Sequence, residues 1–340
     1  MNDEGLKLTA YFGERDRVGE RHVADALVDV FAAHELRTSV LLRGTGGFGA
    51  DHGLHTDRLL TLSEDLPVTA VAVDTSARIA GALPDVRGLG VDGLVTLERA
   101  RLLSGRLDGA PAEAPHEAKL TLYVGRQERA GDATAHEAVV ALLHDQGVAG
   151  ATVLLGVDGT VRGSRRRARL LGRNADVPLM IISVGDAGRI AAALPGLAAI
   201  LSDPLATWER VRVCKRDGEA LTQPLHATET DPEGRPMRQK LMVHASEQAR
   251  HGDRPLYLEL MRRLRGAGAA GATSLRGIWG YHGDHPPHGE VVWQLRRRVP
   301  TVTVLVDSPA NVRRWYPIVD ELTRAGGLVT SELVSPAWAP

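Results

Sequence analysis

The sequence has very little cysteine and few aromatic residues. Only one of its 340 residues is a cysteine, Cys214, and Phe, Trp and Tyr together make up 4%. A single cysteine excludes an internal disulfide framework and suits a reducing compartment. Its surroundings, "VRVCKR", are typical of a strand. We therefore expect an inert buried thiol at this position and no cysteine nucleophile.

The chain also lacks a charge excess and long hydrophobic runs. It contains 41 basic and 42 acidic side chains, a formal net charge of −1, which gives no overall attraction for nucleic acid. No segment approaches the roughly 20 apolar residues that cross a bilayer. The opening "MNDEGLKLTAYFGERD" becomes charged at once, unlike a secretory signal. These features predict a cytoplasmic protein without a transmembrane segment or a direct nucleic-acid partner.

Motifs of the common catalytic classes are missing as well. The sequence contains no G-x-S-x-G, no phosphate-binding loop of the form G-x-x-x-x-G-K-[ST], no H-E-x-x-H and no C-x-x-C. No pair of carboxylates can be placed at a defined separation for acid–base work. We expect a protein that is not an enzyme.

What the sequence does contain is a repeat. "GVAGATVLLG" at 147–156 returns as "GAAGATSLRG" at 268–277. A Lys-Leu pair opens each copy, a glycine follows the lysine by 37 residues, and a proline follows it by 59 or 60. These landmarks are Lys7, Lys119 and Lys240, then Gly44, Gly156 and Gly277, then Pro67, Pro178 and Pro300. Such self-similarity indicates a unit used three times.

The repeat divides the chain into three domains. We assign them to residues 1–104, 118–215 and 239–340, with the loop of the second unit degenerate. The segments between them, 105–117 and 216–238, are rich in Pro, Gly and small polar residues and have the composition of linkers.

Each unit follows the order β-α-β-β-α-β. "LKLTAYFG" alternates like a strand, and "HVADALVDVFAAHE" places apolar residues on one helical face. Right-handed crossovers then place both helices on one face of a four-stranded antiparallel sheet. The other face is bare and apolar, so it needs a partner. Because three copies are tethered, we predict one compact pseudo-threefold body.

The stretches "LKLTAYFGE", "LLRGTGGFG", "LHTDRLLTLSEDLPV" and "GLVTLERARLL" resemble the PII-like family of unknown function numbered 190, and "KLMVHASEQ" and "PTVTVLVDS" of the third copy match it too. The resemblance implies an α+β fold of three ferredoxin-like PII-like units, packed as an intramolecular pseudo-trimer. It also implies ligand clefts between units and a mobile loop after the second strand, here 44–66, 156–177 and 277–299.

PII proteins that hold ATP use a glycine-rich turn ending in a lysine that meets phosphate. The matching stretch here is "GLGVDGLV", and Leu94 stands in the place of that lysine, as Leu205 and Leu328 do in the other copies. The backbone between Gly90 and Gly93 is still able to form an amide nest for an anion. The resemblance therefore implies a nucleotide or another small anion as ligand, with the charge complement for ATP missing.

"RGTGGFG" and "RGIWGYH" share Arg-Gly-x-x-Gly-aromatic at the exit of the second strand. Glycines allow close approach of a ligand, and arginine offers a fork to carboxylate or phosphate. This predicts a ligand cleft; the alternative is a tight turn packed on an aromatic. With the turn above, the candidates are Arg43, Gly44, Gly47, Phe48, Gly49, Gly90, Gly93, Arg276, Gly277, Gly280 and Tyr281.

Two further clusters carry weaker signals. The run "HGDHPPH" offers His282, Asp284, His285 and His288 as zinc or nickel ligands, against the alternative of a solvated loop. The run "GSRRRAR" at 163–169 is either a solvated basic face or a site for an acidic protein surface, a phosphate or RNA.

Together these features favour a PII-like regulatory protein. It would bind a small anion between units and signal through its loops to a protein partner, such as a membrane transporter or channel. The alternatives are a ligand-independent interaction platform and a metal-binding protein built on the histidine loops.

Overall fold

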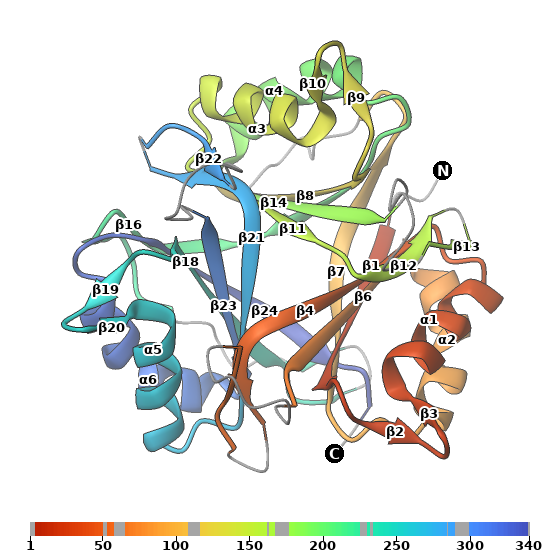
Figure 1. Ribbon diagram of the computed structural model, residues 1–340, viewed down its shortest axis with the longest axis horizontal. Coiled ribbons are helices and arrows are strands. Elements are labelled where there is room, and N and C mark those ends of the chain that lie inside the picture. Colours follow the sequence, from red (N-terminus) through yellow and green to blue (C-terminus); the bar gives the residue numbers. More distant parts are fainter. Residues whose placement is uncertain are drawn as a thin grey trace.

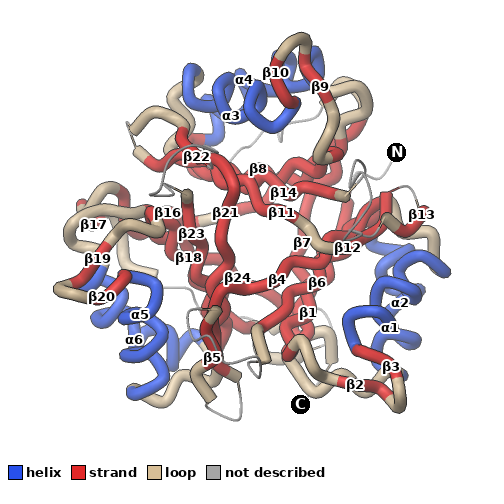
Figure 2. Tube along the Cα trace, viewed as in Figure 1, coloured by secondary structure: helices blue, strands red, loops and turns tan. Residues whose placement is uncertain are grey.

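The computed structural model describes residues 4–49, 53–57, 65–107, 116–161, 163–166, 177–224, 230–231, 234–283, 285–289 and 299–338. The fold is mixed α+β. Three units lie around a common centre, with the strands inside and a pair of helices on the outside of each unit (Figures 1 and 2). The strands of all three units join into one large sheet that forms a barrel-like ring.

The three units contain corresponding elements. The first unit comprises β1 (Glu4–Gly13), β2 (Arg17–Val18), β3 (Arg21–His22), α1 (Val23–Ala33), β4 (Thr38–Phe48), β5 (His55–Thr56), β6 (Pro67–Thr75), α2 (Ser76–Gly88) and β7 (Leu94–Ser104). The second comprises β8 (Glu117–Gly125), β9 (Arg129–Ala130), β10 (Ala133–Thr134), α3 (Ala135–Asp145), β11 (Gly150–Leu155), β12 (Asp158–Val161), β13 (Ser164–Arg165), β14 (Pro178–Asp186), α4 (Ala187–Ile200), β15 (Leu205–Arg210), β16 (Arg212–Arg216) and β17 (Glu219–Ala220). The third comprises β18 (Arg238–Ser246), β19 (Arg250–His251), β20 (Arg254–Pro255), α5 (Leu256–Gly266), β21 (Ala272–His282), β22 (His288–Gly289), β23 (Pro300–Asp307), α6 (Pro309–Leu322) and β24 (Leu328–Pro336).

Within each unit, four long strands pair in the same antiparallel order. In the first unit this order is β4-β6-β1-β7, with the first strand of the chain next to the last strand of the unit. The second and third units repeat it as β11-β14-β8-β15 and β21-β23-β18-β24. The predicted β-α-β-β-α-β order of main elements is therefore present in all three.

Strands also cross the boundaries between units. The second strand of each unit pairs with the second strand of another: β4 pairs with β21, and β21 pairs with β11. In the second unit β12, which directly follows β11, pairs with β4. The last strands connect the units in the same cyclic manner, β15 with β7, β16 with β24, and β24 with β7. Backbone hydrogen bonds therefore tie every unit to both others.

This pairing corrects the predicted loop bounds. The segment after Gly44 was expected to be a loop, but β4 continues to Phe48, and β21 continues past Gly277 to His282. The glycine-rich sequence has the composition of a loop. It forms a strand because the neighbouring unit supplies the hydrogen-bond partners that no local sequence could provide.

The apolar residues form four clusters. Three of them lie under the helix pairs, one in each unit. The fourth lies between the inner faces of the sheets and takes residues from all three units, among them Val71, Met180 and Val304. The bare face of each sheet is thus covered by the other two units. Within the described part of the chain, each helix is too short or too polar to cross a lipid bilayer.

Candidate functional site

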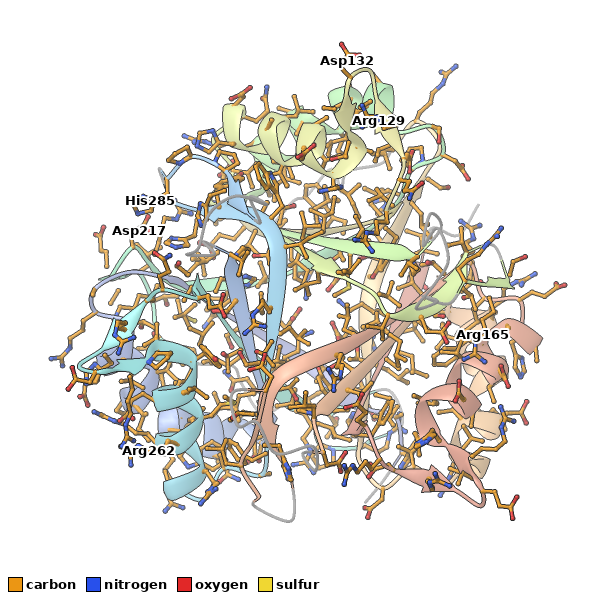
Figure 3. All side chains as sticks on the ribbon, in the orientation of Figure 1. Arg129, Asp132, Arg165, Asp217, Arg262 and His285 are labelled. Carbon is orange, nitrogen blue, oxygen red and sulfur yellow. The ribbon has the colours of Figure 1, made fainter. Side chains whose placement is uncertain are left out.

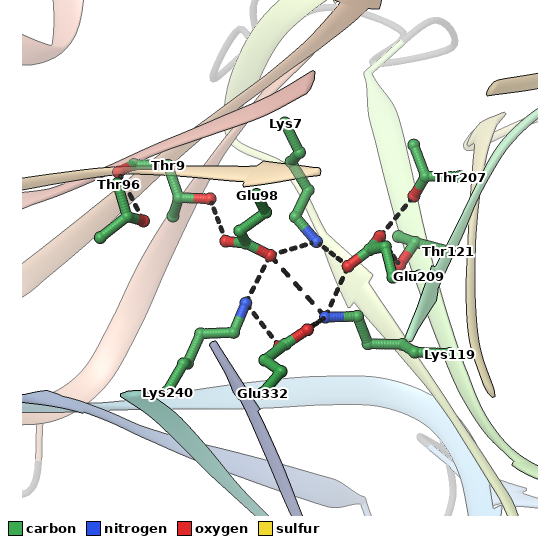
Figure 4. A network of polar contacts seen from close by, with 10 residues as sticks. All are labelled: Lys7, Thr9, Thr96, Glu98, Lys119, Thr121, Thr207, Glu209, Lys240 and Glu332. Carbon is green, nitrogen blue, oxygen red and sulfur yellow. Dashed lines mark hydrogen bonds and ion pairs between the residues drawn. The ribbon is translucent and has the colours of Figure 1, made fainter. Parts of the chain in front are cut away.

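A ring of buried charges lies where the three units meet (Figure 4). It consists of the lysine that opens each repeat and a glutamate from the last strand of each repeat: Lys7, Lys119, Lys240, Glu98, Glu209 and Glu332. In each unit the lysine lies directly opposite the glutamate in the antiparallel register. The six side chains are between 1% and 7% exposed. We call this set the Lys–Glu ring.

Each lysine of the ring contacts the glutamate of its own unit and that of the next. The Nζ of Lys7 lies 2.7 Å from Glu98 Oε2 and 2.5 Å from Glu209 Oε2. Lys119 contacts Glu209 and Glu332, both at 2.6 Å. Lys240 closes the cycle, 2.7 Å from Glu332 and 2.5 Å from Glu98. Because attraction alternates around the whole ring, three positive and three negative charges are neutralised together.

Neighbouring groups favour the charged form of Glu209 and Lys7, whereas burial lowers the pKa of Lys240. Thr9 donates a hydrogen bond to Glu98 at 3.0 Å, and Thr207 donates one to Glu209 at 2.6 Å. Burial raises the pKa of Glu209, but Lys119 and Lys7 outweigh it and bring the pKa to about 2. Burial lowers the pKa of Lys7, and Glu209 and Glu98 more than reverse this.

The ring is better suited to locking the units together than to chemistry. Among the described residues, its three carboxylates are the one group of acidic, His or Cys side chains close enough to share a metal ion. The ammonium groups already occupy the space between them, so a cation would have to displace a lysine. A cavity of about 40 Å³ adjoins the ring, between apolar walls such as Leu42 and Met180. The buried hydroxyl of Thr69, which lines it, has no partner among the described residues, so the cavity suits ordered water.

Glycines of the predicted ligand cleft lie close against a neighbouring strand, and their role in binding a ligand stays a prediction. A Cβ on Gly47 would lie 2.6 Å from the carbonyl oxygen of Ala272, and one on Gly280 would lie 2.2 Å from that of Ala151. Gly159 of the second unit has the same relation to Ser39, at 2.1 Å. The glycine pattern thus persists in the unit whose arginine and aromatic residue are missing, because all three strand crossings need it.

Two landmark residues of the repeat meet at these crossings. A Cβ on Gly44 would lie 2.7 Å from Cγ of Pro67, and one on Gly277 would lie 2.7 Å from Cγ of Pro300. The aromatic residues beside them are core residues. Phe48 is 5% exposed, and Tyr281 is 1% exposed and donates its hydroxyl to the carbonyl of Val148 at 2.9 Å. Gly49, next to Phe48, is exposed.

The two candidate arginines are both paired with carboxylates. Arg43 donates two hydrogen bonds to Glu14, at 2.8 and 2.9 Å. Arg276 contacts Glu247 of its own unit at 2.8 Å and Asp57 of the first unit at 2.9 Å. Arg276 therefore bridges two units, whereas Arg43 is held within one.

Family comparison agrees with the threefold geometry. The family model DUF190, described as "Uncharacterized ACR", matches residues 5–102, 117–213 and 238–335. The chain belongs to the DUF190 family. It carries three tandem DUF190 units, as the repeat landmarks predicted. These matches give the family and no activity.

One relative of known sequence is about as long as a single unit. A protein named UPF0166 from Aquifex aeolicus (strain VF5) is 29% identical over 99 residues, which is 29% of this chain and 92% of the relative. Among solved structures, an aspartate kinase from Synechocystis is 11% identical with a TM-score of 0.25. The match covers 99% of this chain and 52% of the kinase, so the chain spans about half of that protein; a likeness this low carries no argument.

The turn before the last strand of the first DUF190 unit contains Gly90 and Gly93. Gly90 follows α2 with a φ of +64°, a left-handed conformation that glycine adopts easily. A Cβ on Gly93 would lie 2.2 Å from the carbonyl oxygen of Tyr11, so this glycine too allows close strand packing. Leu94 begins β7. A ligand role for this turn stays a prediction.

The histidine cluster of the third DUF190 unit is only partly within the described residues, since Asp284 lies outside them. The rings of His282 and His285 meet edge to face, with centroids 5.4 Å apart. His288 donates from Nδ1 to the carbonyl of Pro286 at 3.0 Å. Asp217 lies 3.8 Å from Nδ1 of His282. A metal role stays a prediction.

The basic loop of the second DUF190 unit has an internal partner. Arg165 forms ion pairs with Asp158 of its own unit and with Asp25 and Asp29 of α1. Figure 3 shows Arg165 beside α1. Arg167 and Arg169 lie outside the described residues. At least the described end of this loop is therefore anchored to the first unit.

Sequence reasoning did not identify the glutamates of the Lys–Glu ring as functional residues. The signal was present, because Thr-x-Glu occurs once in the last strand of each unit, at Glu98, Glu209 and Glu332. A carboxylate repeated at an inward position of three apolar strands needs a buried partner. The lysine landmark at the start of each repeat supplies it.

Proposed function

We propose that the chain is a non-catalytic, cytoplasmic, PII-like regulatory protein. Its three ferredoxin-like DUF190 units would form an intramolecular pseudo-trimer that binds a small anion between units and signals to a protein partner. The supporting observation is the cyclic arrangement, in which the Lys–Glu ring and the crossing strands both run through all three units. A relative matched over 92% of its length by one unit fits the fusion of three such units.

The junction between the third and first units is the best position for the anion. Arg276 lies there with its side chain 26% exposed, and its buried Nε has no partner among the described residues. A carboxylate or phosphate that replaced Asp57 would gain the guanidinium fork and the Nε donor. We therefore expect the ligand to compete with Asp57.

Competition at Arg276 would also produce a signal. Asp57 ends the described segment 53–57, in which β5 pairs with β4. Loss of the ion pair at 2.9 Å would remove one tie between this segment and the third unit and leave the packing of Leu54 on that unit's core as the other. An anion would thus change the surface that the first unit presents to a partner, which is a shift between two states biased by the ligand.

Thermal-shift and calorimetric titration with nucleotides, bicarbonate and organic acids test this mechanism. We expect one compound to give a saturable shift that Arg276→Ala weakens at least about tenfold, as loss of a charge-assisted hydrogen bond does. Asp57→Asn should tighten the same binding, because the internal competitor is removed.

Arg43→Ala is the matched control, since Arg43 holds the corresponding position in the first unit and pairs only with its own unit's Glu14 in the described part of the chain. It should change the affinity less than about twofold. The mechanism is wrong if no compound gives a saturable shift, or if Asp57→Asn weakens binding.

A ligand-independent interaction platform is the second candidate. The bidentate pairing of Arg43 and the packing of the glycines against strands favour it, because both are complete without a ligand. A partner captured equally well with and without added metabolites would support it. Metal analysis of untagged protein separately tests the histidine cluster.

A further inference from the structure

The outer helical face of the third unit is unusually basic. Arg262 and Arg265 of α5 and Arg313 and Arg314 of α6 are exposed, and Figure 3 shows Arg262 on the outside of α5. Arg263 is half-buried, and Arg324 is exposed just after α6. We call these six side chains the arginine face.

The other two units show that the fold does not require these charges. In the repeat register, Arg262, Arg263 and Arg265 correspond to Asp29, Val30 and Ala32 of α1 and to Ala141, Leu142 and His144 of α3. Arg313 and Arg314 correspond to Ala80 and Gly81 of α2 and to Ala191 and Ala192 of α4. Helices with the same packing thus exist without arginine at any of these positions. At these five positions, arginine side chains occur in the third unit alone.

Two of the six arginines, Arg262 and Arg263, are held in place by a buried glutamate. The side chain of Glu259 is 6% exposed and accepts from Arg262 at 2.6 and 2.8 Å and from Arg263 at 2.9 Å. Arg263 also donates to Glu321 at 2.9 Å. The corresponding residue is Ala26 in the first unit. The guanidinium groups are therefore preorganised, which lowers the entropy lost on binding an anion.

A hollow adjoins this cluster. It has a volume of about 410 Å³ and lies between the β19–β20 hairpin and α5, lined by His251, Asp253, Arg254, Glu259 and Arg262. Arg254 and Arg262 are 60% and 53% exposed, so their remaining donors face solvent.

We propose that the arginine face docks an acidic protein segment. Acidic residues such as Asp253 and Glu321 lie among the arginines, which suits the spaced carboxylates of a protein segment better than the closely spaced phosphates of a nucleic acid or membrane. In the described residues the one exposed large apolar side chain is Leu221, outside this face, so there is no aromatic platform for bases and no apolar wedge for a bilayer. The inference rests on the proposed function in expecting a partner, but not on any ligand.

Binding of a fluorescein-labelled peptide of alternating glutamate and glycine, followed by anisotropy without metabolites, tests the proposal. We expect saturable binding that weakens as salt is raised. The double variant Arg313→Glu with Arg314→Glu should lower the affinity at least about tenfold, because like charges then face the peptide. Both side chains are exposed, and circular dichroism checks that the variant is folded.

The matched control is Arg87→Glu with Arg99→Glu, which changes the net charge equally at exposed positions of the first unit. It should alter the affinity less than about twofold. Equal losses in the two variants would show non-specific attraction and overturn the proposal. So would binding to phosphatidylserine vesicles or to single-stranded RNA without saturable binding of the peptide. A ligand response at Arg276 in the absence of peptide binding would overturn this inference alone and leave the regulatory function standing.

Discussion

The centre and the outside of this molecule have diverged to very different degrees. At the centre, all three units contribute the same lysine and the same glutamate, and the contacts between them form one closed cycle. On the outside, α5 carries three arginines, and one of them, Arg262, stands where α1 has Asp29 and α3 has Ala141. The units are therefore alike where they must fit one another and unlike where they face solvent.

The difference separates the requirements of assembly from those of recognition. A buried charge without its partner is costly, so a change in one ring residue would require compensating changes in its own unit and in a neighbouring one. An exposed helical position carries no such constraint, because surface substitutions usually change stability little. Fusion of three units in one chain allows the outer faces to specialise separately. The following predictions test that separation.

The largest effect is expected at the centre. Lys119→Met leaves three glutamates with two lysines in a buried site, and we expect a loss of about 3–5 kcal/mol in the free energy of unfolding. Urea denaturation followed by circular dichroism measures it. Adding Glu332→Gln to the variant should restore part of the loss, because the ring becomes neutral again.

Arg99→Met provides the peripheral counterpart, since Arg99 is exposed and adjoins Glu98 on β7. It should cost less than about 1 kcal/mol. Similar midpoints for Lys119→Met and Arg99→Met would mean that the ring does not hold the units together.

The strand crossings should give the next largest effect. In Gly280→Ala the new Cβ would lie 2.2 Å from the carbonyl oxygen of Ala151, at a φ of +151°. Either the backbone or the junction must shift, and we expect a loss of about 1–3 kcal/mol. Thermal unfolding is the measurement.

A glycine on the outside should respond in the opposite direction. Gly81 lies within α2, and nothing lies within 4 Å of its Cβ position. Gly81→Ala should therefore stabilise the protein by about 0.5–1 kcal/mol. If Gly280→Ala retained full stability and lost only ligand binding, Gly280 would be a ligand residue, as its sequence pattern first predicted.

The same contrast explains how far the sequence could be interpreted. The spacing of Lys7, Gly44 and Pro67 and their counterparts predicted three units, and the structure places Gly44 against Pro67. Hydrophobic periodicity predicted the element order because each helix and strand buries a face within its own unit. These features depend on local sequence and on repetition.

The crossings and the ring depend on contacts between residues far apart in the chain. Lys7 and Glu209 are 202 residues apart, and no periodic pattern links them. Likewise, "RGTGGFG" is locally indistinguishable from a loop, and it forms a strand because β21 pairs with it. Tyr281 was predicted as a ligand residue because its burial is not visible in the local sequence. Residues of the second unit bury it, and Val148 accepts its hydroxyl.

The smallest effect on stability at neutral pH is expected at His244, a buried position where the three units differ. His244 stands on β18 where the first and second units have Tyr11 and Tyr123. Its side chain is 5% exposed, and burial, with Lys119 and His282 nearby, lowers its pKa to about 3. Because the unfolded chain binds a proton near pH 6.5 and the folded protein does not, this residue's contribution to stability is complete above pH 6.5 and is lost as the pH falls toward 3.

Because only the unfolded chain binds this proton, we expect the free energy of unfolding to fall by up to about 1.4 kcal/mol for each pH unit below 6.5. His244→Tyr should remove that slope between pH 6.5 and 5, a range that lies above the usual pKa of carboxyl side chains. Urea midpoints measured across this range give the slope, and His116→Gln, an exposed histidine, is the control. An unchanged slope in His244→Tyr would mean that His244 is protonated within the folded core. The ring at the centre would then tolerate an additional positive charge, which its alternation of three lysines and three glutamates argues against.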